Sequence, residues 1–147
     1  MQPSIPTRGQ LERTLSQQVE ALYASELGHR PGKVTCHIFG EQITVIVEEA
    51  ITQPEQLLTN SGQEDLAEKV RMDLDKALQP KMAELIAEVT GIRVSDLLSD
   101  AKLETGRNGI IAILETAPKL REPASRASSR KQMAAGSSNL DGSSESV

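Results

Sequence analysis

The chain's one cysteine, Cys36, is followed directly by His37, one of only two histidines. A thiol beside an imidazole could serve as a nucleophile with its base. Both residues lie in an alternating segment that predicts a strand, where neighbouring side chains point to opposite faces. We therefore expect Cys36 to be a small buried apolar residue. One thiol and two histidines also lack the spacing of a zinc site, so we predict no catalytic residue, no metal site and no cofactor.

A basic turn is the second candidate for chemistry. Residues 28–33 read Gly-His-Arg-Pro-Gly-Lys, but they lack the strand before, the helix after and the Ser/Thr next to the lysine of a phosphate-binding P-loop. We interpret Arg30 and Lys33 as an exposed basic turn. If the two halves of the chain stack, Arg93 and Arg107 come to the same end of the sheet. The sequence thus predicts an anion- or partner-binding site made of Arg30, Lys33, Arg93 and Arg107.

Acidic residues provide a third candidate. The chain has 21 Asp and Glu against 16 Lys and Arg, and many of the acidic residues follow one predicted helix. Lysines and arginines are interspersed among them, which is typical of a solvated helix face. Asp65 and Lys69, four residues apart, form a stabilising pair on such a face. We assign no acid–base chemistry to these carboxylates.

The elements that position these residues begin with a helix. Leucines and a valine recur near every third or fourth position over residues 9–27, which predicts one buried helix face. Gly28 follows and suits a left-handed helix end. Residues 34–39 and 43–47 then alternate around a Gly-Glu turn. This pattern predicts a hairpin with one apolar face and one mixed face.

The second half of the domain begins with residues 51–63, predicted as a loop or a short helical turn. Ser61 and Glu64 have the spacing of a capping box, which predicts the start of a helix. A periodic apolar segment then runs from residue 66 to residue 89. Pro80 lies inside this segment, so we expect a kinked helix rather than a straight one.

Two further strands complete the domain. They are predicted at residues 94–98 and 110–114, separated by a link rich in turn-forming residues. The order helix–strand–strand therefore occurs twice. It predicts an α+β fold, in which two such units form a four-stranded, mostly antiparallel sheet with the helices on one face. Since few large residues are available for a core, we also predict that the domain gains burial as a homodimer.

Composition changes sharply after Pro118. Residues 119–147 contain eight serines and few large apolar residues, which predicts a disordered Ser-rich tail. Five basic residues fall within 119–131, whereas the rest of the chain is acidic overall. We therefore divide the chain into an N-terminal extension (1–8), a domain (9–118) and the tail. The tail is either a solvated terminus or a weak tether to an anionic surface.

Composition argues against several functional classes. A length of 147 residues suits one domain. No apolar run reaches the ~18–20 residues that a membrane span needs, and the first residues lack the apolar stretch of a signal peptide. The net charge of -5 and the lack of aromatic residues among the cations argue against nucleic-acid binding. We expect a cytoplasmic protein without a transmembrane segment.

Several segments, in order and spacing, resemble a known family. Residues 9–12 read Gly-Gln-Leu-Glu, residues 27–34 read Leu-Gly-His-Arg-Pro-Gly-Lys-Val, and residues 88–94 read Glu-Val-Thr-Gly-Ile-Arg-Val. From residue 8 to residue 118 the pattern resembles the bacterial MpsC family, named after a component of Na+-translocating, membrane-potential-generating systems. The resemblance implies a soluble cytoplasmic accessory domain that acts beside membrane ion-transport machinery. It provides no catalytic residues to carry over.

The sequence leaves two functional hypotheses. The first is a non-enzymatic accessory or regulatory module that binds a protein partner, for instance a subunit of a membrane transporter. The second is a sensor domain that binds small anions or nucleotides with its basic turns. Because no residue pattern indicates a substrate, we do not predict an enzyme.

Overall fold

The computed structural model describes residues 4–122 of the chain. The chain divides into two units, Gly9–Pro118 and a second one formed by Met1–Arg8 together with Lys119–Val147. Most of the predicted Ser-rich tail, residues 123–147, and the first three residues of the predicted N-terminal extension lie outside the described residues.

Within the second unit, described residues that precede the domain are hydrogen-bonded to one that follows it. The backbone N–H of Arg121 donates to the carbonyl of Pro6 at 2.8 Å. The Nε of the same arginine donates to the carbonyl of Ile5 at 3.1 Å. Residues that the sequence assigns to two separate extensions are therefore locally paired.

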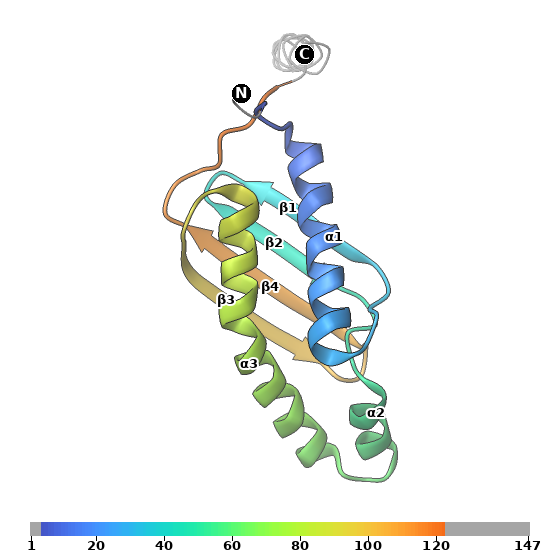
Figure 1. Ribbon diagram of the computed structural model, residues 1–147. Coiled ribbons are helices and arrows are strands. Elements are labelled where there is room, and N and C mark those ends of the chain that lie inside the picture. Colours follow the sequence, from blue (N-terminus) through green and yellow to red (C-terminus); the bar gives the residue numbers. More distant parts are fainter. Residues whose placement is uncertain (1–3, 123–147) are drawn as a thin grey trace, which may run out of the picture. The chain divides into compact units, whose positions relative to one another are not determined.

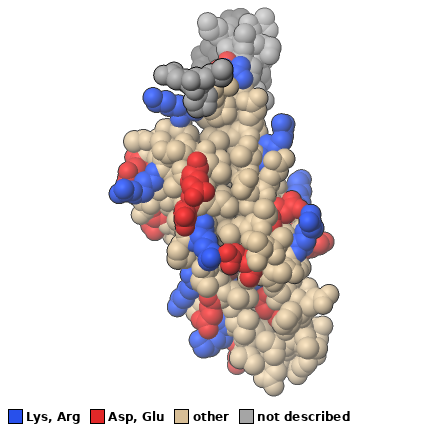
Figure 2. Space-filling model, viewed as in Figure 1, with Lys and Arg blue, Asp and Glu red and all other residues tan. Residues whose placement is uncertain are grey.

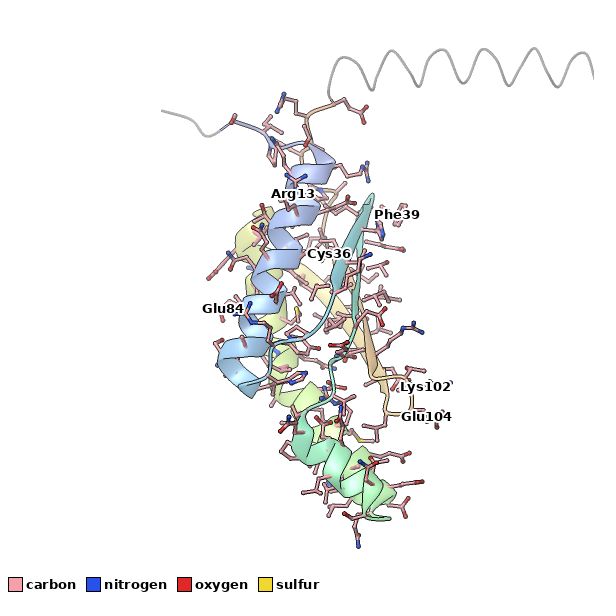
Figure 3. The ribbon with its side chains drawn as sticks, turned by 90° about the vertical axis from the view of Figure 1, so that its right-hand side faces the viewer. Arg13, Cys36, Phe39, Glu84, Lys102 and Glu104 are labelled. Atoms are coloured by element: carbon pink, nitrogen blue, oxygen red, sulfur yellow. The ribbon has the colours of Figure 1, made fainter. Side chains whose placement is uncertain are left out.

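Three helices and four strands follow one another along the described chain. Their bounds are α1 Arg8–Leu27, β1 Val34–Phe39, β2 Gln42–Val47, α2 Gln53–Asn60, α3 Glu64–Thr90, β3 Val94–Lys102 and β4 Arg107–Leu114. The strands form one sheet in the order β1-β2-β4-β3, and every neighbouring pair is antiparallel. Figure 1 shows α1 and α3 across one face of this sheet, and the side view in Figure 3 shows helices on one side and strands on the other. The predicted α+β fold is confirmed.

Helix α1 packs on the sheet through one stripe of residues. Leu11, Leu15, Val19 and Tyr23 recur every four residues and are buried. Leu and Val at this spacing share one face because 3.6 residues make a turn. Gly28 ends the helix with φ +61°, the left-handed conformation predicted for it.

Helix α3 is continuous across Pro80, and Figure 1 shows its axis changing direction about midway along its length, as predicted. Its start differs from the prediction, because the residue before the helix is Gln63 and not Ser61. The hydroxyl of Ser61 instead donates to the carbonyl of Leu57 at 2.7 Å, at the end of α2. The capping box of this region belongs to α2, where Thr52 and Glu55 form it.

The strand pairs follow the predicted alternation. The β1–β2 hairpin turns at Gly40, which has φ +57°. The second pair is longer than predicted: β3 continues to Lys102 and β4 begins at Arg107, three residues before the expected start. The extra residues are Ser, Asp, Ala and Lys in β3 and Arg, Asn and Gly in β4, so they carry little of the apolar pattern from which strands are predicted.

The core lies between the helices and one face of the sheet, called here the covered face. Its strand residues alternate along the chain and are at most 4% exposed: Cys36, Ile38, Ile43, Val45, Val47, Ile110, Ala112 and Leu114. Each large apolar side chain buried in this way contributes about 1.5–3 kcal/mol relative to its exposed state. The hydrophobic effect thus fixes the sheet under the helices.

Candidate functional site

The structure does not bring the four predicted cations together. Arg93 precedes β3, and its carbonyl accepts the N–H of Glu115, just after β4 ends. Arg107 begins β4 and pairs with Lys102, at the opposite end of the same strand pair. The prediction of one common sheet end is wrong for Arg93, because consecutive antiparallel strands place the start of one beside the end of the next.

Three of these cations already have acidic neighbours. Ion pairs join Arg30 to Glu20 at 3.3 Å and Arg93 to Glu115 at 3.9 Å. A third joins Arg107 Nε to Glu48 at 2.7 Å. The carboxylates offset much of the positive potential that an anion site requires. Lys33 is exposed at the end of the loop that precedes β1. A binding role of the four residues stays a prediction.

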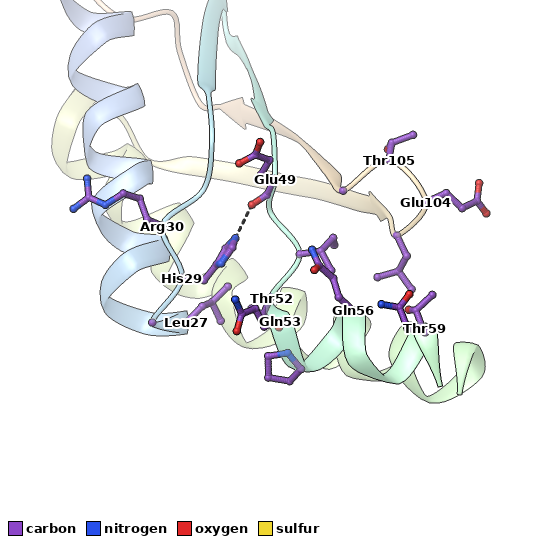
Figure 4. A pocket seen from close by; sticks show the side chains of 16 residues that line it. Leu27, His29, Arg30, Glu49, Thr52, Gln53, Gln56, Thr59, Glu104 and Thr105 are labelled. Atoms are coloured by element: carbon purple, nitrogen blue, oxygen red, sulfur yellow. Dashed lines mark hydrogen bonds between the residues drawn. The ribbon is translucent and has the colours of Figure 1, made fainter. Parts of the chain in front are cut away.

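A cavity of about 850 Å³ lies where α1 ends, α2 begins and the β3–β4 turn approaches (Figure 4). His29 Nε2 lies 2.6 Å from the carbonyl oxygen of Glu49, so this nitrogen carries the proton. Glu49 has φ +51°, a conformation uncommon for residues other than glycine. Arg30 and Glu104 also line the cavity. Cationic and acidic groups are mixed along its wall, and the arginine is paired with Glu20.

Cys36 is buried and His37 is exposed, on opposite faces of β1 as predicted. Burial raises the pKa of the Cys36 thiol, which keeps it protonated. Among residues 4–122, no group of three or more His, Cys, Asp or Glu side chains could hold a metal ion.

An ion-pair network that the sequence did not reveal lies beneath α2 and α3. Arg71 is 3% exposed and Glu55 is fully buried. The guanidinium binds both carboxylate oxygens, at 2.7 Å from Nε and 2.6 Å from Nη2. Nη2 also donates to the carbonyl of Ala50 at 3.0 Å, and Nη1 donates to Asp75 at 3.1 Å. One arginine therefore connects α2, α3 and the loop after β2.

The network shifts the pKa values of its two acids in opposite directions. Burial alone would raise the pKa of Glu55, but hydrogen bonds from Arg71 and Thr52 outweigh burial and lower it. For Asp75, burial is the largest cause and raises the pKa, although Arg71 acts against it. Negative neighbours, Glu55 and Asp100, raise it further. Glu55 is therefore firmly ionised, whereas the charge on Asp75 is disfavoured.

A second buried polar contact joins α1 to β4. Asn108 Nδ2 donates to the Tyr23 hydroxyl at 2.6 Å. The Oδ1 of Asn108 is buried and accepts no hydrogen bond within the described residues. The same burial raises the pKa of Tyr23. Both polar contacts position the helices over the sheet and point inward from the surface.

The sequence did not reveal these buried charged residues, because Arg, Glu and Asp are common on exposed helix surfaces. The acidic and basic residues of the 64–90 segment were all interpreted as solvated, yet Arg71 and Asp75 face the core. One signal could have found Glu55. The segment Thr52-x-x-Glu55 has the form of a capping box, which indicates a carboxylate turned back toward the chain.

The other side of the sheet, called here the open face, has no helix over it (Figure 3). An apolar patch on this face consists of Ile46, Leu98, Ile111 and Ile113, which the strand pairing places beside or diagonal to one another. Phe39 ends the outer strand β1 on the same face, and Gln42 lies between it and Ile113. Phe39 is 64% exposed, Leu98 53% and Ile111 43%. Apolar surface gathered in this way marks an interaction site more often than a single exposed leucine does.

On both outer strands of the sheet, carboxylate side chains accept hydrogen bonds from backbone N–H groups. In β1, the backbone N–H of Ile38 donates to Glu12 of α1 at 2.9 Å. In β3, the N–H groups of Leu97 and Ala101 donate to the side chains of Asp96 and Asp100. An N–H that is satisfied in this way is not available for an added strand. The sheet therefore offers its face to a partner more readily than its edges.

Helix α2 and the first half of α3 extend past the sheet as a helical arm (Figure 1). Leu57, Leu66 and Met72 are exposed along it. In Figure 2, Lys and Arg are interspersed with Asp and Glu over the rest of this view, whereas the end over α2 carries neither.

Within residues 4–122, none of the helices combines the length and the apolar character needed to cross a bilayer. No curated protein and no solved structure matches the chain. The family described as "Na+-translocating membrane potential-generating system (MpsC)" matches residues 7–116, a range that contains every helix and strand described above. The resemblance seen in the sequence is confirmed: the chain belongs to the MpsC family.

Proposed function

We propose that this domain is a non-enzymatic accessory module of a Na+-translocating membrane system, and that it acts in the cytoplasm by binding a protein partner through its open face. The family description supports the link to such a system. The exposed patch around Ile111 is the observation that carries the binding role.

A protein partner fits this face better than a small ligand does. The patch lies on the uncovered face of the sheet, where polar residues such as Thr44 and Gln42 lie beside the apolar ones. Small ligands favour concave sites that surround them, whereas protein interfaces combine an apolar centre with a polar rim. Because Glu12 and the two aspartates occupy edge N–H groups, the partner packs on the face rather than adding a strand.

The chemistry of the buried groups supports a role without catalysis. Cys36 is a protonated thiol away from solvent, and His37 cannot reach it across the sheet. The polar atoms of Arg71 and Glu55 form hydrogen bonds with each other and with the backbone. Groups that are saturated in this way hold the helices in position.

The alternative, a sensor of small anions, gains no support from the geometry. Its four cations lie at both ends of the sheet, and three of them have acidic neighbours. It stays a prediction from the sequence.

Site-specific photo-crosslinking in the native host tests the proposed function. The full chain would carry benzoylphenylalanine at Phe39, on the open face, or at Arg13, on the helix side (Figure 3). We expect position 39 to give a defined covalent adduct that mass spectrometry identifies as a protein of a membrane ion-transport system or of its regulation. Adducts of equal yield from both positions, or none from position 39, would overturn the proposal.

A further inference from the structure

We propose that a single water molecule binds between α3 and the sheet, where it bridges the Asp75 carboxylate to the contact between Tyr23 and Asn108. This water joins the two buried polar contacts described above into one network. The inference concerns the interior of the domain, so it does not depend on the proposed function.

A buried acceptor without a donor is the first observation. Asn108 is 2% exposed, and within the described residues its Oδ1 accepts no hydrogen bond. The Tyr23 hydroxyl accepts a hydrogen bond from Asn108 Nδ2, and no described residue accepts the proton of that hydroxyl. Buried polar atoms of folded proteins nearly always have a partner, and an ordered water often provides it. Two neighbouring groups therefore call for one small partner that both donates and accepts.

A cavity of about 10 Å³ borders the same two side chains. Its polar lining residues are Tyr23, Asp75, Gln79, Ser99 and Asn108, and the others are apolar. About 10–15 Å³ is the least space that holds one water, so this cavity has room for one water and for little else. Asp75, Gln79 and Ser99 also line a cavity of about 370 Å³ between α3 and β3, which provides a route from solvent.

The hydrogen-bonding groups around the small cavity match one water. One carboxylate oxygen of Asp75 accepts from Arg71 Nη1 at 3.1 Å, and the other has no donor among the described residues. A water that accepts the Tyr23 proton and donates to Asn108 Oδ1 and to Asp75 forms three hydrogen bonds, the usual number for a buried water. Because water both donates and accepts, it serves the amide of Asn108 in either orientation of its oxygen and nitrogen.

A cation fits the same space less well than water. The guanidinium of Arg71 lies against Asp75, so a second positive charge in this cavity is repelled at close range. Neither a metal ion nor an ammonium ion can accept the proton of the Tyr23 hydroxyl. The chemistry of the lining residues thus favours a neutral occupant.

The bridge has an energetic consequence that can be measured. Asp75 and Asn108 form no direct hydrogen bond with each other, since Asp75 binds Arg71 and Asn108 binds Tyr23. If one water binds both, removing either side chain weakens the binding of that water to the other. The stabilities of variants at the two positions should then depend on each other.

The first experiment is a crystal structure of the full chain, at a resolution that places individual waters. We expect one water in the small cavity, with its oxygen about 2.5–3.0 Å from the Asn108 amide oxygen and from an Asp75 carboxylate oxygen. This measurement uses the natural chain, so it does not depend on the folding of any variant.

The second experiment is a double-mutant cycle with Asp75→Leu and Asn108→Leu, followed by urea unfolding. The hydrogen bonds of the water are lost only once in the double variant. Its unfolding equilibrium constant should therefore be at least about threefold smaller than the product of the two single effects predicts. The matched control pairs Asn108→Leu with Asp73→Leu, an exposed carboxylate on the same helix, and those effects should multiply within about twofold. Circular dichroism checks that each variant is folded.

Four outcomes would overturn the inference. They are a crystal structure without a water in the small cavity, a metal ion there with contacts shorter than hydrogen bonds, single effects of Asp75→Leu and Asn108→Leu that simply multiply, and an Asp73 control that deviates as much as Asp75 does. A water at this position together with coupling at Asp75 alone supports the bridge.

Discussion

The two sides of the sheet use neighbouring residues of the same strands for different purposes. Ile110 is 3% exposed beneath the helices, and Ile111, the next residue, is 43% exposed on the open face. Two ion pairs differ in burial in the same way. The Arg71–Glu55 and Arg107–Glu48 pairs have N–O distances of 2.6 and 2.7 Å, but only the Arg71–Glu55 pair is buried. Burial rather than contact distance therefore separates the groups that stabilise the fold from those available to a partner.

Breaking the buried ion pair should have the largest effect. Arg71→Met leaves the Glu55 carboxylate buried without its cation, which we expect to lower the free energy of unfolding by about 3–5 kcal/mol. Arg107→Met removes an exposed arginine at nearly the same contact distance and should cost less than about 1 kcal/mol. Urea unfolding of both variants measures the difference. Equal losses would contradict the comparison.

Substitutions of Ile110 and Ile111 compare the apolar residues of the covered face with those of the open face. Ile110→Ala creates a cavity in the core and should lower the free energy of unfolding by about 2–5 kcal/mol. Ile111→Ala changes a half-exposed side chain, so the loss in the isolated protomer should be about 1 kcal/mol or less. Chemical denaturation at low protein concentration separates this term from any contribution of association. A larger loss from Ile111→Ala would mean that the open face is part of the protomer's own core.

The buried contact between α1 and β4 should have an intermediate effect. Tyr23→Phe removes the acceptor of the Asn108 amide and leaves a buried donor unsatisfied, at a cost of about 1–3 kcal/mol. Adding Asn108→Val removes the orphaned amide as well, and the double variant should recover part of that loss. A double-mutant cycle from thermal unfolding measures the coupling. Purely additive losses would show that the hydrogen bond itself contributes little.

The smallest expected effect concerns pH, because the two acids of the network oppose each other. The lowered pKa of Glu55 gives stability that is present above its usual pKa and is lost as the pH falls through its folded value. The raised pKa of Asp75 acts in the other direction, since the folded state binds that proton more readily than the unfolded state does. Asp75→Asn removes the opposing contribution. The decrease in the free energy of unfolding from pH 7 to pH 4 should therefore become steeper than in the natural chain.

The control for this pH series is Asp73→Asn, which neutralises an exposed carboxylate on the same helix. Its pH dependence should stay close to that of the natural chain. A curve for Asp75→Asn that is unchanged or shallower would contradict the assigned direction of the Asp75 pKa.

Much of the architecture could be predicted because local patterns agree with the final fold. The period of four over Leu11, Leu15 and Val19 is a helix face that needs a sheet beneath it. The alternation around Cys36 places the thiol inside and His37 outside without further information. The capping box predicted at Ser61 did not form, because the Ser61 hydroxyl donates instead to the carbonyl of Leu57 at the end of α2.

The site residues could be predicted less well. Arg30 and Arg107 were expected together with Arg93, but strand direction separates Arg93 from Arg107. Arg71 and Asp75 belong to a helix whose other charged residues are mostly exposed, and composition does not distinguish them. The exposed patch on the open face is visible in the sequence only as a mixed strand face.

The sequence by itself determined the periodicities, the glycine and proline positions, and hence the helices, the strands and their order. These are properties of a few neighbouring residues and of the backbone that joins them. Only the tertiary structure decided which charged residues are buried, which cations meet and which sheet face is left uncovered. Each of those properties depends on residues far apart in the chain, such as Arg71 with Glu55 and Tyr23 with Asn108, because burial is set by the packing of whole elements.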